Sequence, residues 1–203
     1  FDVQWLKTST ETVFADYFDL DLIPETSVDE VFVDLGGYIG DTVEDFVASY
    51  SDRYKRIYTY EVNPQNYQEL MENIAQYRNV IARNKAIGAE RGTMYLNLEI
   101  GGSSTTIAKT GELEVDVVTL DEDIEERISW IKMDIEGSEQ SALQGCRRHI
   151  ENEKPKLTIC TYHNNEDIWK IPQMVKEYNE DYKLYLRYNG NKDWPSEYVL
   201  FAL

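Results

Sequence analysis

The chain has 203 residues, of which 42% are hydrophobic, enough for the core of one globular domain. Its 38 acidic and 20 basic residues give a formal net charge of −18, so nucleic acid and anionic membranes would be repelled at long range. No apolar run approaches the roughly 18 residues of a membrane span, and no signal peptide is visible. Cys146 and Cys160 lack metal-type spacing. We therefore expect a cytoplasmic protein with free thiols and no nucleic-acid or membrane partner.

The domain organisation is simple. No internal repeat, low-complexity segment or linker divides the chain, so we expect a single domain over residues 1–203 with an N-terminal lead-in over residues 1–27. The chain begins with Phe1 and not with Met, which suggests that an upstream region is missing from this sequence.

The first half of the chain alternates short apolar runs with segments of helical spacing. In chain order we expect a strand at 31–35, a helix at 41–50, a strand at 56–60, a helix at 64–77 and a strand at 80–87. The longer helix begins with Pro64, a residue favoured at the first helical position. This order predicts a parallel sheet.

The second half begins with two alternating runs, 93–99 and 114–120, on either side of the glycine- and serine-rich segment 101–106. They predict a small β insert over residues 93–120. The remaining expected elements are a strand at 130–133, a helix at 138–150, a strand at 157–161, a helix at 167–178 and closing strands at 183–188 and 198–203. The predicted fold class is a doubly wound, Rossmann-like α/β domain.

Residues 33–42, VDLGGYIGDT, join the first strand to the first helix. Gly36 and Gly37 permit a tight turn and close approach of the backbone to a ligand, and Gly40 lets the helix begin close to it. In open α/β sheets ligands bind at this end of the strands. Tyr38 occupies a place where the dinucleotide fingerprint needs glycine, and no Lys follows Gly40 as a phosphate loop requires.

Two acidic residues favour a different nucleoside. Asp41 at the helix start disfavours a diphosphate but tolerates a ligand with an amine and a sulfonium. The spacing of Asp34, Gly36 and Gly40 is the pattern associated with S-adenosylmethionine. Glu61 follows the second strand, where an acid can accept both ribose hydroxyls; an exposed strand-end carboxylate without a ligand is the alternative. We predict S-adenosylmethionine as the cofactor.

The chain resembles the FkbM family of methyltransferases in five segments: 31–42, 58–64, 84–92, 117–121 and 130–145. The most specific stretch is 131–139, IKMDIEGSE, which is similar to the K-x-D-x-E-G-x-E signature of that family. The resemblance covers roughly residues 28–203, and Val62 departs from it where members usually have Pro. It implies a class I methyltransferase sheet of seven strands, mostly parallel with an antiparallel closing strand, and O-methylation of a sugar, polysaccharide or other small hydroxylated acceptor.

The predicted site residues lie in the glycine turn and at the strand ends. Cofactor contacts are expected from Asp34, Gly36, Gly37, Tyr38, Gly40, Asp41, Thr42, Glu61, Asn63, Ala86, Ser104 and Asp134. Ser104 belongs to the segment that either closes over the cofactor or forms a plain turn. Asp134 and Glu136 follow the central strand and orient the methionine amine, bind an acceptor hydroxyl or hold a cation; the alternative for Glu136 is to cap the next helix.

His163 follows the next strand and should open onto the same crevice, where a histidine suits general-base catalysis. A lone histidine is more often structural. We predict His163, Asp134 and Glu136 as catalytic residues. A divalent cation held by these residues or by Asn164 is an alternative that we do not favour, so no metal site is predicted. His149, at a helix end, is expected to be solvated or to compensate the helix dipole.

The predicted function is S-adenosylmethionine-dependent methylation of a small-molecule or glycan acceptor. One alternative is a non-catalytic nucleoside-binding module of the same fold, which the intact glycine turn and Glu61 disfavour. Another is a nicotinamide-dependent oxidoreductase, which Tyr38 and Asp41 disfavour. A nucleic-acid methyltransferase is disfavoured by the acidic charge. The acceptor and the oligomeric state do not follow from the sequence.

Overall fold

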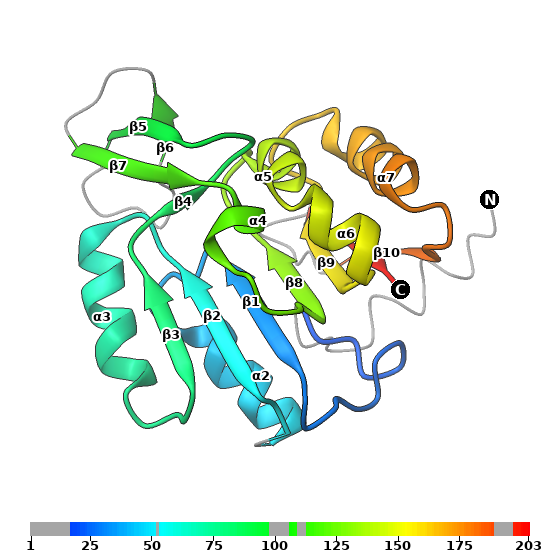
Figure 1. The fold of residues 1–203 in the computed structure, drawn as a ribbon, viewed down its shortest axis with the longest axis horizontal. Coiled ribbons are helices and arrows are strands. Elements are labelled where there is room, and N and C mark those ends of the chain that lie inside the picture. Colours follow the sequence, from blue (N-terminus) through cyan, green and yellow to red (C-terminus); the bar gives the residue numbers. More distant parts are fainter. Residues whose placement is uncertain (1–16, 52, 98–105, 109–112, 189–196) are drawn as a thin grey trace.

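A computed structural model describes residues 17–51, 53–97, 106–108, 113–188 and 197–203. Its centre is a seven-stranded sheet with the order β10-β11-β9-β8-β1-β2-β3 (Figure 1). The strands are β1 (Val31–Leu35), β2 (Arg56–Tyr60), β3 (Val80–Arg83), β8 (Trp130–Met133), β9 (Lys156–Cys160), β10 (Leu184–Tyr188) and β11 (Tyr198–Ala202). Strand β11, between β9 and β10, runs antiparallel to the other strands of this sheet. The predicted mostly parallel sheet with an antiparallel closing strand is confirmed.

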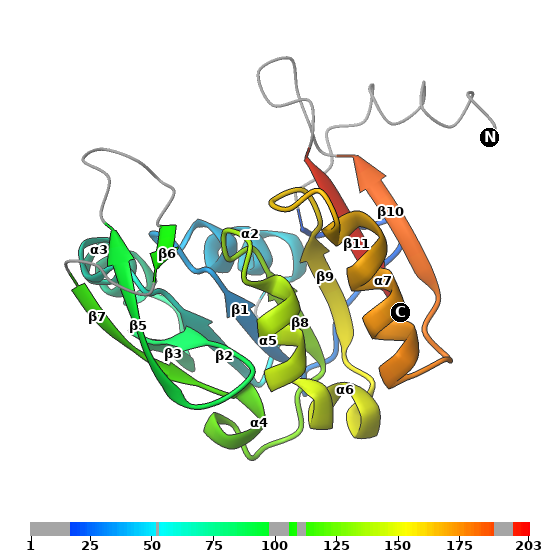
Figure 2. The same cartoon turned by 90° about the horizontal axis from the view of Figure 1, so that it is seen from above.

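Helices cover both faces of this sheet (Figure 2). On one face lie α2 (Asp41–Tyr50) and α3 (Pro64–Ile74); on the other lie α5 (Glu139–Gly145), α6 (Arg147–Glu153) and α7 (Asp167–Tyr178). On the α2 side, Phe32 of β1 stacks on Phe46 of α2 with ring centroids 4.5 Å apart, and both side chains are fully buried. Such aromatic pairs add to the free energy gained by burying the rings.

A second sheet of four strands lies beyond the carboxyl ends of β2 and β3 (Figure 1), with the order β4-β7-β5-β6. Its strands are β4 (Ala86–Ile87), β5 (Gly92–Asn97), β6 (Thr106–Ala108) and β7 (Leu113–Val118). The predicted β insert is therefore present. Strand β6 was not expected, and the run at 114–120 ends earlier than predicted, because Leu120 already begins the short helix α4 (Leu120–Asp123).

Two predicted elements are divided in the structure. The expected strand 80–87 splits into β3 and β4, because the Asn84 side chain donates hydrogen bonds to the carbonyls of Glu61 and Val62 and turns the chain from one sheet to the other. The expected helix 138–150 splits into α5 and α6 at Cys146, whose φ of −107° and ψ of 5° lie outside the helical region. The helix predicted over 64–77 ends at Ile74.

The topology places a crevice between β1 and β8. The chain proceeds from β1 outward to β2 and β3, and later from β8 outward to β9 on the other side. The connections leave β1 and β8 in opposite directions, so their carboxyl ends form the switch point at which open α/β sheets bind ligands.

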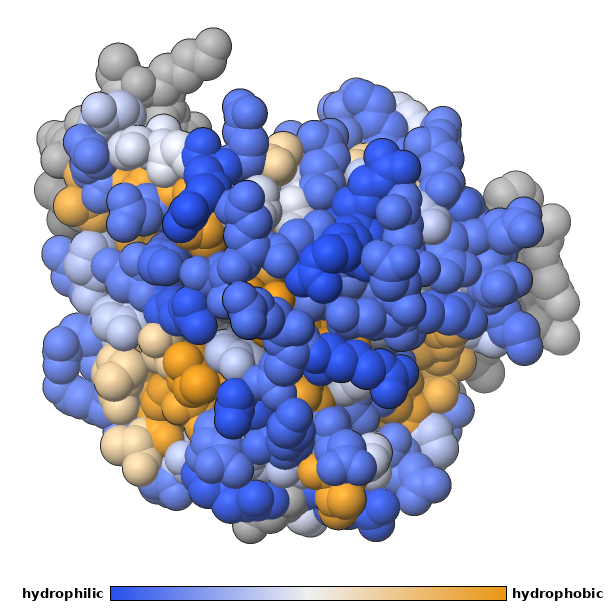
Figure 3. Space-filling view, in the orientation of Figure 1, coloured by the Kyte–Doolittle hydropathy of each residue, from blue (hydrophilic) through white to orange (hydrophobic). Residues whose placement is uncertain are grey.

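The hydropathy of the surface and of the helices indicates which kind of partner the protein can bind. The face that carries α4 to α7 is largely hydrophilic, with its apolar side chains in separate areas (Figure 3). Within the described residues, no helix is long and apolar enough to span a membrane. Both cysteines are free and buried, as expected.

Candidate active site

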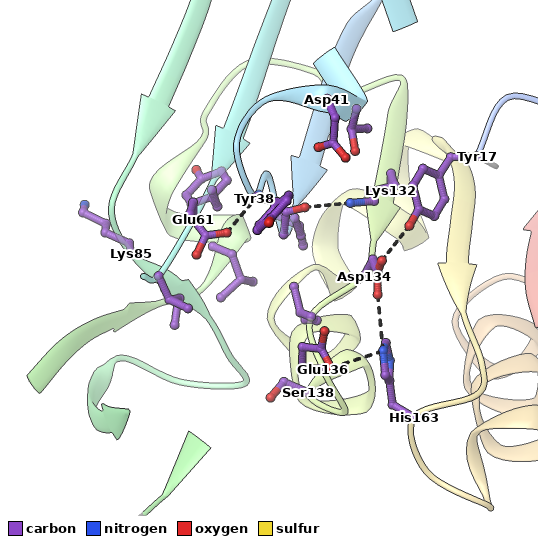
Figure 4. A pocket seen from close by; sticks show the side chains of 18 of the residues that line it. Tyr17, Tyr38, Asp41, Glu61, Lys85, Lys132, Asp134, Glu136, Ser138 and His163 are labelled. Carbon is purple, nitrogen blue, oxygen red and sulfur yellow. Dashed lines mark hydrogen bonds and ion pairs between the residues drawn. The ribbon is translucent and has the colours of Figure 1, made fainter. Parts of the chain in front are cut away.

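A cavity of about 700 Å³ opens at this switch point, within the usual size range of small-molecule sites. Figure 4 shows Glu61 and Lys85 toward one end and Asp134, Glu136 and His163 toward the other. The predicted site residues that line it are Gly36, Tyr38, Asp41, Thr42, Glu61, Ala86, Asp134, Glu136 and His163. Asp34, Gly37, Gly40 and Asn63 are not part of its wall, and Ser104 lies outside the described residues.

The glycine turn is shaped by its protein neighbours. The backbone N–H groups of Gly36 and Gly37 donate to the carbonyl of Tyr60, 3.0 and 2.9 Å away. A Cβ on Gly36, whose φ is +88°, would collide with the backbone of Asp134, and a Cβ on Gly37 would collide with the Thr59 hydroxyl. These glycines are therefore required for packing of the turn against the ends of β2 and β8. Of these two glycines only Gly36 lines the cavity, so the expected close approach of the backbone to a ligand applies to Gly36 alone.

Glu61 is fixed at the end of β2 by backbone donors. Its Oε2 accepts from the N–H of Tyr38 at 2.9 Å, and its Oε1 accepts from the N–H of Asn63 at 2.7 Å. Burial raises the pKa of Glu61, and the two backbone hydrogen bonds oppose this effect. Each carboxylate oxygen has a further lone pair for a ligand hydroxyl. Asn63 itself caps α3 by accepting from the N–H of Gln65.

Lys132, to which the sequence assigned no role, supports the site from within β8. Its ammonium lies 2.9 Å from Oδ1 of Asp34 and donates to the carbonyl of Gly36 at 2.8 Å. Burial would lower the pKa of Lys132, but the charges of Asp34 and Asp134 and the hydrogen bond to Asp34 together raise it. Asp34 also accepts from the hydroxyl of Thr59. Asp34 therefore supports the turn from below. We expected it to contact the cofactor, but it does not line the cavity.

Asp134 lies on the cavity wall directly after β8. Its Oδ2 accepts a hydrogen bond of 2.6 Å from the hydroxyl of Tyr17. Its Oδ1 is buried and has no hydrogen-bond partner among the described residues. Tyr17 belongs to the lead-in and lies with its ring 4.7 Å from the Lys132 ammonium. No sequence signal indicated that this residue reaches the site.

Glu136 stands in a strained turn between β8 and α5. Its φ is +54°, a left-handed value uncommon for residues other than glycine, and the φ of Gly137 is +94°. Ser138, the residue before α5, makes no side-chain cap hydrogen bond, and the charge of Glu136 beside this helix end stays an alternative role. Oε2 of Glu136 lies 3.6 Å from Nε2 of His163. Strain of this kind is concentrated at functional sites.

His163 joins these acids from the loop after β9. Its Nε2 lies 3.4 Å from Oδ1 of Asp134, and its Nδ1 is 2.9 Å from Oε1 of the fully buried Glu139 (Figure 4 shows the Asp134 and Glu136 sides). Burial lowers the pKa of His163, but the hydrogen bond and charge of Glu139, with the charges of Asp134 and Glu136, raise it above the ordinary value. The predicted convergence of His163, Asp134 and Glu136 is present; Glu139 was missed, although it is the last acid of the signature.

Asp134, Glu139 and His163 each bring one oxygen or nitrogen within 4.8 Å of the others. The short contact between Glu139 and Nδ1 of His163 has the length of a hydrogen bond, and we describe the three as a hydrogen-bonded and charged network. His149 is separate from it. That side chain is fully buried and contacts Glu153 at 2.8 Å, so the expected solvated role is wrong.

The cavity suits S-adenosylmethionine on two observations. Glu61 offers only acceptor atoms at one end, which match the donor hydroxyls of a ribose. At the other end Oδ1 of Asp134 is buried without a hydrogen bond, and a cationic ligand satisfies such an oxygen. The structure therefore provides sites of the right chemistry for the nucleoside and for the cationic end of this cofactor.

Solved structures share the fold. A methyltransferase FkbM from Methylobacillus flagellatus KT aligns with 88% of the chain at 26% identity and a TM-score of 0.73, and this chain spans 44% of its length. An rRNA methylase from Streptococcus thermophilus aligns at 13% identity with a TM-score of 0.57, over 87% of each chain. Fibrillarin from Aeropyrum pernix, solved with natively bound S-adenosyl-L-methionine, aligns over 88% of this chain and 67% of its own, at 13% identity and a TM-score of 0.57.

No curated protein sequence matches the chain. The family model described as methyltransferase FkbM domain matches residues 34–192, which include the glycine turn, Glu61 and the acids around His163. Because this match covers most of the chain, the protein belongs to the FkbM family of methyltransferases, whose methyl donor is S-adenosylmethionine.

Proposed function

We propose that this chain transfers a methyl group from S-adenosylmethionine to a hydroxyl of a sugar, polysaccharide or other small hydroxylated acceptor. The observation that supports it best is the order of groups along one cavity, with Glu61 toward one end and His163, Asp134 and Glu136 toward the other. The first suits a ribose and the second suits a hydroxyl that must lose a proton.

Cofactor binding would rest on residues of three loops. Glu61 accepts the ribose hydroxyls, while the backbone of Gly36 and Tyr38 forms the wall beside it. Asp134 attracts the cationic end of the cofactor through Oδ1, which accepts no hydrogen bond among the described residues. The hydrogen bond from Tyr17 holds Oδ2 of Asp134, and Oδ1 lies on the side of His163, 3.4 Å from its Nε2.

The bound cofactor supplies an activated methyl group, so the protein has two tasks: alignment of the acceptor and removal of one proton. His163 lines the cavity, and we assign the second task to it because a histidine suits proton removal at neutral pH. Its raised pKa makes it a stronger base but also keeps it protonated at acidic pH. Glu136 and Asp134 are positioned to accept hydrogen bonds from the acceptor.

The acidic composition supports an uncharged acceptor. The net charge of −18 disfavours nucleic acid and anionic lipid, and carboxylates gather at the proposed acceptor end of the cavity. We therefore propose a small-molecule or glycan partner, not a nucleic acid or a membrane.

Calorimetric titration with S-adenosylmethionine, S-adenosylhomocysteine and NAD tests the first half of the proposal. We expect binding of both sulfur compounds and none of NAD. A panel of sugars and polyols with methyl-labelled cofactor then tests transfer, read by mass spectrometry of the products. Binding of NAD alone would support the oxidoreductase instead, and cofactor binding without transfer to any acceptor would favour a nucleoside-binding module.

A further inference from the structure

Glu139 is a buried acid behind the cavity wall. It is the first residue of α5, its side chain is fully buried, and it does not line the cavity. Burial of a carboxylate is costly unless its oxygens are used. The function proposed above gives Glu139 no role, so its contacts need a separate explanation.

Those contacts determine where His163 carries its proton. Oε1 of Glu139 accepts from the backbone N–H of Ile135 at 3.0 Å and lies 2.9 Å from Nδ1 of His163. Because the oxygens of an ionised carboxylate have only lone pairs to offer, Nδ1 is the donor in the second contact when Glu139 carries its charge. In the neutral imidazole the hydrogen therefore lies on Nδ1 and the lone pair lies on Nε2.

Nε2 is the nitrogen nearer the acids of the cavity wall. It lies 3.4 Å from Oδ1 of Asp134 and 3.6 Å from Oε2 of Glu136. Tyr162, the preceding residue, packs its ring 4.3 Å from the imidazole ring. Charged groups therefore face the imidazole from the end of β8, from the turn before α5 and from α5 itself, and all of them are acids that stabilise its protonated form.

We infer that Glu139 is the positioning residue of His163: it holds the hydrogen on Nδ1, aims the lone pair of Nε2 into the cavity and stabilises the imidazolium that forms. The catalytic part of this inference rests on the proposed methyl transfer. There the acceptor O–H bond breaks and its proton goes to Nε2. The electron pair stays on oxygen and forms the new bond to the methyl carbon, and the pair of the broken carbon–sulfur bond stays on sulfur.

The tautomer can be measured without an acceptor. The chain has two histidines, so ¹⁵N-histidine labelling gives two sets of ring signals, and His163→Asn identifies the set of His163. We expect the neutral ring of His163 to carry its hydrogen on Nδ1. A neutral ring with the hydrogen on Nε2 would overturn the inference, even in a protein that binds the cofactor and transfers methyl groups.

Glu139→Gln tests the charge while it keeps the geometry, because the amide oxygen can still accept from both Ile135 and His163. We expect the pKa of His163 to fall in this variant, measured by NMR titration. The matched control is Glu69→Gln, which changes an exposed acid on α3 and should leave that pKa unchanged. An unchanged pKa of His163 in folded Glu139→Gln contradicts the inference. If the variant does not fold, the tautomer of His163 measured in the wild type decides whether the inference holds.

Kinetics on an acceptor found in the panel add a third readout. Glu139→Gln should lower the single-turnover rate by about tenfold or more, but by no more than the roughly 10²–10⁴-fold expected for loss of the general base itself, and move the pH profile to lower pH. In a His163→Ala background the same substitution should have no further effect on the rate. An equal loss of rate in the wild-type and His163→Ala backgrounds would show that Glu139 has a structural role only. An Nδ1–H tautomer in a protein with no methyl transfer would overturn the proposed function and leave the positioning geometry standing.

Discussion

Lys132 and Asp34 form a fully buried ion pair beneath the glycine turn, with 2.9 Å between Nζ and Oδ1. Their side chains are 1% and 0% exposed. The same ammonium donates to the carbonyl of Gly36, so the pair connects β8 to the first turn of the cavity wall. A charge in the middle of an apolar strand is costly unless it is paired, which explains why Lys132 and Asp34 lie on neighbouring strands in register.

Removal of one partner should therefore destabilise the fold. We expect Lys132→Met to lower the free energy of unfolding by about 3–5 kcal/mol, because it leaves Asp34 buried and unpaired. Urea unfolding followed by circular dichroism measures this, and the double variant Lys132→Met/Asp34→Asn should recover part of the loss. Lys55→Met is the control: its ion pair with Glu126 is half exposed and should change the stability by at most about 1 kcal/mol.

Glu61→Gln should weaken binding of S-adenosylmethionine. The amide keeps one acceptor oxygen and loses the charge, and a hydrogen bond to a charged group contributes about 1.5–3 kcal/mol, so we expect a dissociation constant roughly 10–100 times higher. Calorimetry on folded protein measures it, with Glu69→Gln as the exposed control. Equal affinities in wild type and Glu61→Gln would show that Glu61 serves only the loops of Tyr38 and Asn63.

Much of this architecture was predictable because it depends on local patterns. The strands at 31–35 and 56–60 and the helix at 41–50 have the predicted bounds, since their apolar spacing and glycine boundaries are local signals. The divided elements were not predictable in this way. The turn at Asn84 depends on carbonyls at the end of β2. Gly145 precedes the break at Cys146, but a glycine within a helical pattern does not by itself end a helix.

The site shows the same limit. Glu61, Asp134 and His163 follow strands, so their convergence at one end of the sheet was predictable from topology. Tyr17 comes from the lead-in, and its contact with Asp134 spans 117 positions of sequence. Lys132 and Glu139 were visible in the signature, but their partners were not, because a residue's burial partner is a property of the packed structure.

Tyr17→Phe should separate the orientation of Asp134 from the fold. The ring remains and packs as before, while Oδ2 of Asp134 loses its 2.6 Å donor. We expect a loss of about 1 kcal/mol in stability, typical of one hydrogen bond, together with weaker binding of S-adenosylmethionine. Thermal unfolding and calorimetry measure the two effects. Unchanged cofactor affinity would show that Asp134 keeps its orientation without Tyr17.

The raised pKa of His163 predicts how stability depends on pH. A histidine with a higher pKa in the folded than in the unfolded state stabilises the fold below the unfolded value of about 6.5, and this contribution is lost as pH rises through the folded pKa. The difference in unfolding free energy between wild type and His163→Gln should therefore be largest at acidic pH and decrease above neutrality. Urea unfolding from pH 5.5 to pH 9 tests this; a difference that grows with pH would show that burial dominates instead.

The most direct test of the chemistry is His163→Ala. His163 lines the acceptor end of the cavity, and the variant retains both acids assigned to the cofactor, Glu61 and Asp134, so it should keep its affinity for S-adenosylmethionine while its turnover falls by about 10²–10⁴-fold. Below its raised pKa, Nε2 of His163 is protonated and cannot act as a base. The wild-type rate should therefore rise with pH in a range above the ordinary pKa of histidine, and the variant should lose this rise. Single-turnover rates across pH, on the acceptor identified in the panel, measure both effects. A variant that retains more than about half of the wild-type rate with the same pH profile would remove His163 from the mechanism, and the proton would then pass to Asp134 or Glu136, the two acids that line the same end of the cavity.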